Sequence, residues 1–137
     1  MTQEEKQLLL KDLCGRLPYG VKINHIIYNW EGTCINFTRK LESFAIEKDN
    51  GLSYDVPVEE VRPYLRPMNS MTEEEEMEVK KLGVCYDKAF HNDIYDTGIS
   101  MEEAFTAISW FLERHFDINY LIEKGLALEA PVDMYKQ

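Results

Sequence analysis

Residues 1–17 have the hydrophobic spacing of one amphipathic helix. Four apolar residues recur at intervals of three and four positions, which places them on one helical face: Leu10, Leu13, Cys14 and Leu17. Thr2 and Glu5 have the spacing of a capping box, in which each side chain accepts a hydrogen bond from the other residue's backbone N–H. We therefore predict a helix that begins after Thr2 and ends near Gly15 and Pro18, with Cys14 as a small core residue.

From Val21 onward the apolar residues recur with a period of two, which is typical of strands. Residues 21–30 form the first run, with a break near His25 that we interpret as a bulge, and residues 30–33 (WEGT) read as a turn. Residues 33–39, 41–48 and 52–56 form three further runs. Asn50-Gly51, between the last two, predicts a hairpin because these residues tolerate positive φ. The pattern predicts a four-stranded antiparallel meander or small open barrel, with the N-terminal helix as its cover.

Prolines mark the end of this β-rich part. Pro57 should end the fourth strand because it has no N–H to donate, and residues 58–61 can form one short helical turn. Pro63 and Pro67 each push the preceding residue out of the helical region. We therefore expect residues 62–67 to be extended and rigid.

The acidic run 73–76 is typical of a helix start, because carboxylates are favourable at the positive end of the helix dipole. Two pairs have capping-box spacing: Ser70 with Glu73, and Thr72 with Glu75. The helix either stops at Gly83 or continues to about Phe90, and the sequence leaves both possibilities open.

The clearest amphipathic pattern follows a predicted cap at Ser100, which pairs with Glu103. Its apolar stripe comprises Ala104, Phe105, Ile108, Phe111 and Leu112, widened by Trp110. We expect Asp117 to cap a last short helix over residues 118–124, followed by an extended tail.

The chain is therefore predicted to be one α+β domain, with a β-rich part over about residues 1–66 and a helical part over about 67–137. Residues 1–66 carry 9 Lys/Arg and 10 Asp/Glu, whereas residues 67–137 carry 6 and 15, and the net charge of the chain is −10. The acidic second half disfavours non-specific binding to nucleic acid.

No apolar run is long enough to span a membrane, and the N-terminal residues do not resemble a secretory signal. Cys14, Cys34 and Cys85 are widely spaced and odd in number, which is typical of reduced thiols and not of a disulfide framework. We therefore expect a cytoplasmic protein.

The sequence points to no catalytic, cofactor-binding or metal-binding residue with specificity. His25 and His115 have structural interpretations, as a strand histidine with satisfied hydrogen bonds and as a cationic helix C-cap. An alternative is a small metal-dependent enzyme that uses Cys85, Asp87, His91 and Asp96, although no established ligand spacing is present. A reactive pair of Cys34 and His25 is a weaker alternative.

A nucleic-acid-binding module is a further alternative, because a small β-meander can stack bases on aromatic side chains. The available basic and aromatic residues are Lys22, Arg39, Lys40, Tyr28, Trp30 and Phe37. They form no basic cluster in the sequence.

Protein recognition is the leading hypothesis. Trp30 and the segment Arg62-Pro63-Tyr64-Leu65-Arg66 combine aromatic and arginine side chains, the residue types that dominate interface energies. A rigid extended segment also loses little entropy on binding. The competing interpretation is that Tyr64 and Leu65 face the core while both arginines are solvated.

Two stretches, EEVRPYLRPMNSMTEEE and HFDINYLIEKGLALEAP, resemble an uncharacterised family of small proteins from gut Bacteroides. The matching residues are Arg62 to Glu75, His115 to Asp117, and Gly125 to Pro131, and residues 83–98 look peculiar to this chain. The resemblance implies a bacterial, cytoplasmic protein carried on phage-like or mobile DNA. It implies no activity and assigns no functional residue. From these observations we expect a non-enzymatic accessory protein that binds another protein, in an oligomeric state that the sequence leaves open.

Overall fold

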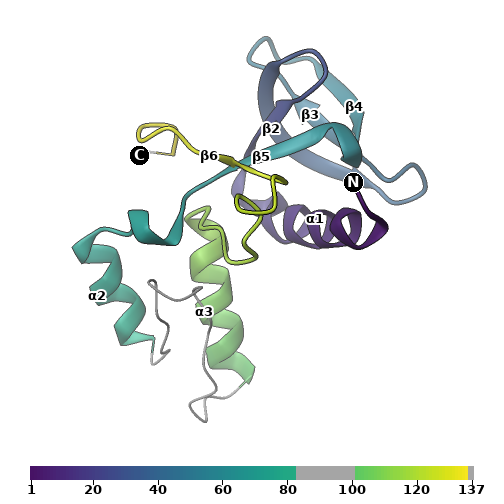
Figure 1. Cartoon of the computed structure of the whole chain (residues 1–137). Coiled ribbons are helices and arrows are strands. Elements are labelled where there is room, and N and C mark those ends of the chain that lie inside the picture. The colour runs from purple at the N-terminus through teal and green to yellow at the C-terminus, as the bar shows by residue number, and fades with distance from the viewer. Residues whose placement is uncertain (83–100, 136–137) are drawn as a thin grey trace.

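The computed structural model describes residues 1–82 and 101–135. Within them the helices are α1 (Gln3–Arg16), α2 (Glu73–Lys81) and α3 (Met101–Glu113). The strands are β1 (Lys22–His25), β2 (Trp30–Thr38), β3 (Ser43–Glu47), β4 (Ser53–Pro57), β5 (Val61–Leu65) and β6 (Leu128–Glu129). Short 3-10 turns span Leu17–Tyr19, Val58–Glu60 and Met68–Ser70. Figure 1 shows α1 against a curved sheet, with β5 leading from this sheet toward α2 and α3.

Helix α1 begins as the sequence predicts. The Thr2 hydroxyl accepts from the Glu5 N–H at 3.0 Å, and the Glu5 carboxylate accepts from the Thr2 N–H at 2.9 Å, so both halves of the capping box form. The helix continues through Gly15 to Arg16. Its buried side carries Leu9, Leu10, Asp12, Leu13 and Arg16. The prediction that Cys14 is a core residue is wrong, because the buried face is rotated toward Leu9 and leaves the thiol exposed.

The described strands form one sheet in the order β4-β3-β2-β1-β5-β6. The four strands β1 to β4 form an antiparallel meander, and β5 adds to it antiparallel to β1. β6 pairs with β5 in parallel. The α+β class is therefore confirmed, but the prediction of four antiparallel strands is wrong: the sheet is six-stranded and mixed.

The first turn of the sheet lies four residues earlier than expected. Residues 26–29 form it, and WEGT belongs to β2 instead. Asn29 has a φ of 50°, and its side chain accepts a hydrogen bond from the Asn24 amide at 3.1 Å, so this pair of asparagines replaces the Gly-containing turn that the sequence suggested. The irregular pairing lies between Cys34 and Asn36 and not at His25.

The predicted hairpin at residues 49–51 is present between β3 and β4. Lys48 and Leu52 close it with a hydrogen bond of 2.9 Å, and only Gly51 has positive φ, at 84°. The loop therefore has three residues, not two, which is the usual geometry when a single left-handed residue ends the turn.

Residues 62–67 are extended, as the two prolines predict, but most of them also form a strand. Pro63 pairs with Ile23 of β1, while β6 pairs only with Tyr64 and Leu65. Among the described residues, Pro63 therefore lies where β5 has a neighbouring strand on one side only, which is where a strand tolerates a missing N–H. Pro57 ends β4 and Val58–Glu60 forms a single helical turn, both as expected.

A second apolar cluster, separate from the core between α1 and the sheet, lies around α2 and α3. It contains Met68, Met71, Val79, Trp110, Phe111 and Phe116, with Leu82 and Ile118 packed against it. Of the predicted α3 stripe, Trp110 and Phe111 are buried, but Phe105 is 73% exposed and Ile108 is 40% exposed. The buried face of α3 is centred on Ala107, not on Ala104. The predicted continuation of α2 past Gly83 and the cap at Ser100 lie outside the described residues.

The end of α3 differs from the predicted cationic cap. His115 has a φ of 64°; its N–H donates to the Leu112 carbonyl at 3.0 Å, and the Phe116 N–H donates to the Phe111 carbonyl at 3.0 Å. These two bonds form a Schellman motif, with His115 at the position where glycine is usual. Burial, followed by the positive charge of Arg16, lowers the pKa of His115 to about 4, so the ring is neutral and the prediction of a charged cap is wrong.

Asp117 does act as a cap. Its carboxylate accepts from the N–H groups of Leu121 at 2.9 Å and Ile122 at 3.0 Å. The segment it caps is a series of turns instead of the expected helix, and Gly125 ends it with a φ of 74°. The chain then enters β6, so the predicted extended tail is an edge strand of the sheet.

The sheet tolerates no side chain at Gly32. A Cβ atom there would lie 2.5 Å from Ile46 Cγ2 and 2.8 Å from the Glu47 carbonyl oxygen, and the second of these is backbone. We expect Gly32→Ala to lower the free energy of unfolding by about 1–3 kcal/mol through overpacking. Urea denaturation measures this change.

Gly15→Ala is the matched control, because its added Cβ would make an ordinary contact of 3.4 Å with Leu112 Cδ1. Within α1 this substitution should be neutral or stabilise the protein by up to about 1 kcal/mol. Equal unfolding midpoints for the two variants would contradict the close approach of β2 and β3.

Candidate functional site

A groove of about 500 Å3 opens where β5 ends. One wall comes from residues 66–75, which lead from β5 into the first turn of α2, and the other from residues 129–135, which begin at the last residue of β6. The two walls lie far apart in sequence. Figure 1 shows how β5 and β6 bring them to one edge of the sheet.

Arg66 forms the joint of this region. Its N–H donates to the His115 carbonyl at 2.8 Å, and its carbonyl accepts from the Asp117 N–H at 2.9 Å, so the backbone connects β5 to the segment after α3. Its guanidinium carbon lies 4.1 Å from the centre of the Phe116 ring, within cation–π range. A single residue thus contacts both the sheet side and the helical side.

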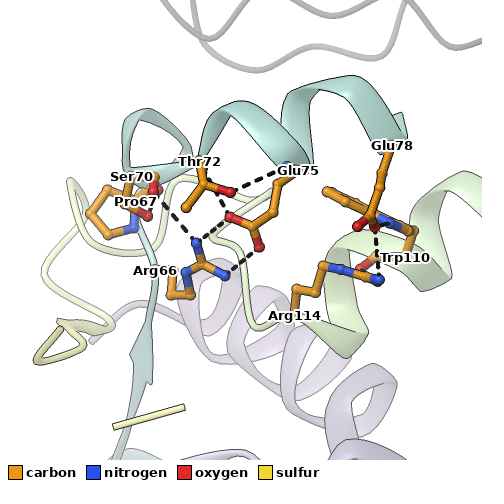
Figure 2. Close-up of polar contacts among 8 residues, drawn as sticks. All are labelled: Arg66, Pro67, Ser70, Thr72, Glu75, Glu78, Trp110 and Arg114. Carbon is orange, nitrogen blue, oxygen red and sulfur yellow. Dashed lines mark hydrogen bonds and ion pairs between the residues drawn. The ribbon is translucent and has the colours of Figure 1, made fainter. Parts of the chain in front are cut away.

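The Arg66 side chain also fixes the start of α2. Nη1 donates to Glu75 Oε2 at 2.8 Å and Nη2 donates to Glu75 Oε1 at 2.7 Å, a bidentate pair (Figure 2). The same Oε1 accepts from the Thr72 N–H at 3.0 Å, so the capping box forms with Thr72 and Glu75, one of the two pairs that the sequence offered. Burial alone would raise the pKa of Glu75, but the hydrogen bonds from Arg66 and Thr72 outweigh it and the pKa is lowered.

A second polar contact ties α2 to α3. Glu78 Oε2 accepts from the Trp110 indole N–H and from Arg114 Nη2, each at 3.1 Å (Figure 2). The Arg114 guanidinium carbon also lies 4.3 Å from the centre of the Trp110 ring. Glu75 and Glu78 therefore have structural roles.

Two carboxylates on the groove walls differ from these. Glu74 and Glu129 are exposed, and neither makes an ion pair or hydrogen bond with another described residue. The lining also includes apolar residues from both walls, Pro67, Ala130, Pro131 and Val132, beside the polar Ser70 and Thr72. The groove therefore presents negative charge beside an apolar surface.

The far wall is held by Tyr135. Its hydroxyl donates to the Tyr64 carbonyl at 2.7 Å and accepts from the Lys22 N–H at 2.9 Å. Its ring stacks on His115 with 3.8 Å between the ring centres. Burial raises the pKa of the Tyr135 hydroxyl, which keeps it protonated and able to donate.

A buried ion pair lies near the C-terminal end of α1. Arg16, fully buried, donates to Asp12 through Nε at 2.7 Å and through Nη2 at 3.0 Å. Nη2 also donates to the Phe116 carbonyl at 2.6 Å. This contact connects α1 directly to the segment that pairs with Arg66.

The five residues predicted to bind a partner are only partly brought together. Leu65 is fully buried in the core, and the Arg62 guanidinium turns back to the carbonyls of Glu59 and Val61. The Tyr64 hydroxyl donates to Glu31 at 3.0 Å, and Arg66 is engaged by Glu75.

Trp30 belongs to a separate cluster at the first turn of the sheet. Of the five predicted residues, Arg66 alone lines the groove. The groove carboxylates Glu74 and Glu129 were not predicted, because nothing in the sequence indicates that the tail pairs with β5.

The residues of the alternative sites that the sequence suggested do not come together among the described residues either. Cys34 is buried and pairs with Ile46, whereas His25 pairs with Trp30 and Val61, so the two are separated along the sheet. Burial also raises the pKa of the Cys34 thiol to about 12, which contradicts a reactive pair. Trp30 begins β2, whereas Arg39 and Lys40 follow its far end, roughly 25–30 Å away at the rise of a strand. Cys85, Asp87, His91 and Asp96 lie outside the described residues.

Among the described residues no group of three or more His, Cys, Asp or Glu side chains could hold a metal ion. Within the same residues, no helix combines the length and apolar character that crossing a membrane requires.

Comparison with known proteins returns no family model, no curated protein and no solved structure that matches this chain.

The Arg66–Glu75 pair should contribute to stability in a pH-dependent way. Glu75→Gln preserves the capping-box geometry but removes the charge, so we expect a loss of about 1–2 kcal/mol at neutral pH. Because the folded pKa of Glu75 lies below its ordinary value of 4.5, the stabilisation is complete above that value and disappears as the pH falls through the folded pKa.

Urea unfolding of both proteins over this pH range measures the difference. A difference in stability that is zero at neutral pH, or one that does not change with pH, would contradict the assigned pair.

His115 should make the protein less stable in mild acid. The unfolded state takes up a proton near pH 6.5, whereas the folded state does not until about pH 4, so stability falls between these values, by at most about 3 kcal/mol. His115→Asn removes this titration and still tolerates positive φ.

The stability of wild type relative to this variant should therefore decrease as the pH is lowered from 6.5 to about 4. A constant difference over that interval would show that His115 is not buried as a neutral ring.

Proposed function

We propose that this chain is an accessory protein that acts by binding, and that its groove takes an extended, basic segment of another protein. The observation that carries this proposal is the pair of carboxylates, Glu74 and Glu129, on opposite walls of an open groove with apolar residues in its lining. A lysine or arginine side chain supplies both the charge and the aliphatic stem that such a surface complements.

Internal hydrogen bonds hold both walls of the groove, which supports a binding role. Arg66, Glu75 and Thr72 hold one wall by a bidentate pair and a capping box. Tyr135 holds the other wall through two hydrogen bonds to backbone groups. A surface that is already ordered loses little conformational entropy when a partner binds.

The segment Arg62 to Arg66 was predicted to contact a partner directly, and we now assign it the role of shaping the groove. Arg66 shapes the groove and does not reach out to a partner, because its guanidinium is already paired with Glu75. Direct contact falls to the exposed groove residues, among which Val132 is 89% exposed. Each wall then contributes one carboxylate, Glu74 or Glu129, together with part of the apolar lining.

A random-peptide display library tests the proposal. Selection on the purified chain should enrich sequences that place a lysine or arginine beside apolar residues. Affinity of the selected peptides should fall with added salt, since the charges involved are partly exposed. The charge-reversal variant Glu74→Lys/Glu129→Lys should bind them at least about tenfold more weakly.

Glu102→Lys/Glu123→Lys is the matched control. It changes the net charge by the same amount at exposed positions outside the groove lining, and it should bind the peptides like wild type. Failure to enrich any peptide, or equal losses in the two double variants, would overturn the groove as the binding surface.

A further inference from the structure

An aromatic cluster lies at the opposite end of β5 from the groove, around the first turn of the sheet. The rings of Trp30 and Tyr54 are 5.8 Å apart at their centres and inclined by 53°. They form two walls of a corner, which we call the aromatic notch. Tyr54 is 43% exposed, so the notch is open to solvent on its Tyr54 side.

The Trp30 wall is fixed from behind. The His25 ring stacks on Trp30 with centres 5.1 Å apart and planes within 2°. His25 is itself oriented at both ring nitrogens, since Nε2 lies 2.9 Å from Glu60 Oε1 and Nδ1 accepts from the Tyr28 N–H at 3.1 Å. The Trp30 ring is therefore already fixed in place, and its face away from His25 can contact a ligand without a loss of side-chain freedom.

A cation already lies in the notch. Lys48 Nζ is 4.8 Å from the centre of the Trp30 ring and 5.6 Å from that of Tyr54, both within cation–π range. No carboxylate among the described residues lies within ion-pair distance of this ammonium. The two ring faces are therefore its observed partners, and the geometry accepts an ammonium group.

The surrounding charge favours a cation over an anion. Glu60 contacts His25 behind the notch, and the hairpin that bears Lys48 also carries Glu47, Asp49 and Asp55 at exposed positions. The net charge of the whole chain is −10. A nucleic acid strand stacking on the same rings would meet this negative field.

We propose that the aromatic notch of Trp30 and Tyr54 is a binding site for a quaternary ammonium group, which displaces the side chain of Lys48. A methylated ammonium is less strongly hydrated than the lysine ammonium and fills the corner between two rings more fully, so it competes effectively for the same faces. This site is separate from the groove, and neither site depends on the other.

Choline is the probe, and the indole N–H signals of the two tryptophans are the readout in NMR titrations. The Trp30 signal should shift on titration. Trp110 donates its indole N–H to Glu78 within the helical half, so its signal is an internal reference that should not move. The neutral analogue 3,3-dimethylbutan-1-ol has the same shape without the charge and should produce a much smaller shift.

Two variants make the result specific to the notch. Lys48→Ala removes the internal competitor and should tighten choline binding by about two- to fivefold. Tyr54→Leu keeps an apolar side chain at an exposed strand position but removes one ring, and it should abolish the shift. The affinities of choline and of acetylated trimethyllysine amide are then compared. Tighter binding of choline indicates a small free ligand, and tighter binding of the trimethyllysine derivative indicates a modified protein side chain.

The proposal is overturned if choline leaves the Trp30 signal unchanged in both wild type and Lys48→Ala. Equal shifts from choline and its neutral analogue, or an undiminished shift in Tyr54→Leu, would also overturn it. A loss of peptide binding at the groove would leave these outcomes unaffected, because the reporter lies in the sheet.

Discussion

Arg66 joins the two parts of this protein. Its backbone forms hydrogen bonds with the residues on either side of Phe116. Its guanidinium donates two hydrogen bonds to Glu75 at the start of α2 and packs over the Phe116 ring. A lysine could supply one charge but not two parallel hydrogen bonds together with a flat face for stacking. Together with the apolar cluster around Val79 and the Glu78–Arg114 contact, this side chain sets the position of α2, and with it one wall of the groove.

Two apolar clusters meet at that joint. One lies between α1 and the sheet, and the other between α2 and α3. Polar contacts connect them, since Arg16 of α1 reaches the Phe116 carbonyl and the Asn119 side chain reaches Asp12. Breaking one partner of a buried ion pair is costly, so the bonds that Arg16 makes through Nε and Nη2 favour one arrangement of the two clusters, although its Nη1 has no hydrogen-bond partner among the described residues. Both candidate binding surfaces lie on the sheet or at its edge, where this arrangement keeps them ordered.

The sequence predicted local features well where a single turn of chain decides them. The capping boxes at Thr2 and Thr72, the hairpin at Gly51 and the end of β4 at Pro57 all depend on residues within a few positions of one another. It failed where a distant segment decides the outcome. Residues 61–65 form a strand despite Pro63, because β1 pairs with them on one side and β6 begins only beyond the proline. The groove carboxylates and the neutral His115 were missed for the same reason, since the burial and proximity that define them come from the fold.

Native-state hydrogen exchange tests the role of Arg66 most directly. The N–H groups of Arg66 and Asp117 form the backbone link between the two parts, and the N–H of Cys34, which donates to the Val21 carbonyl, reports on the sheet. If Arg66 joins the two clusters into one cooperative unit, all three amides should exchange with the same free energy of opening, equal to that of global unfolding. Exchange of the Arg66 and Asp117 amides at a much lower free energy than the Cys34 amide would show that the two parts open independently and would contradict this account.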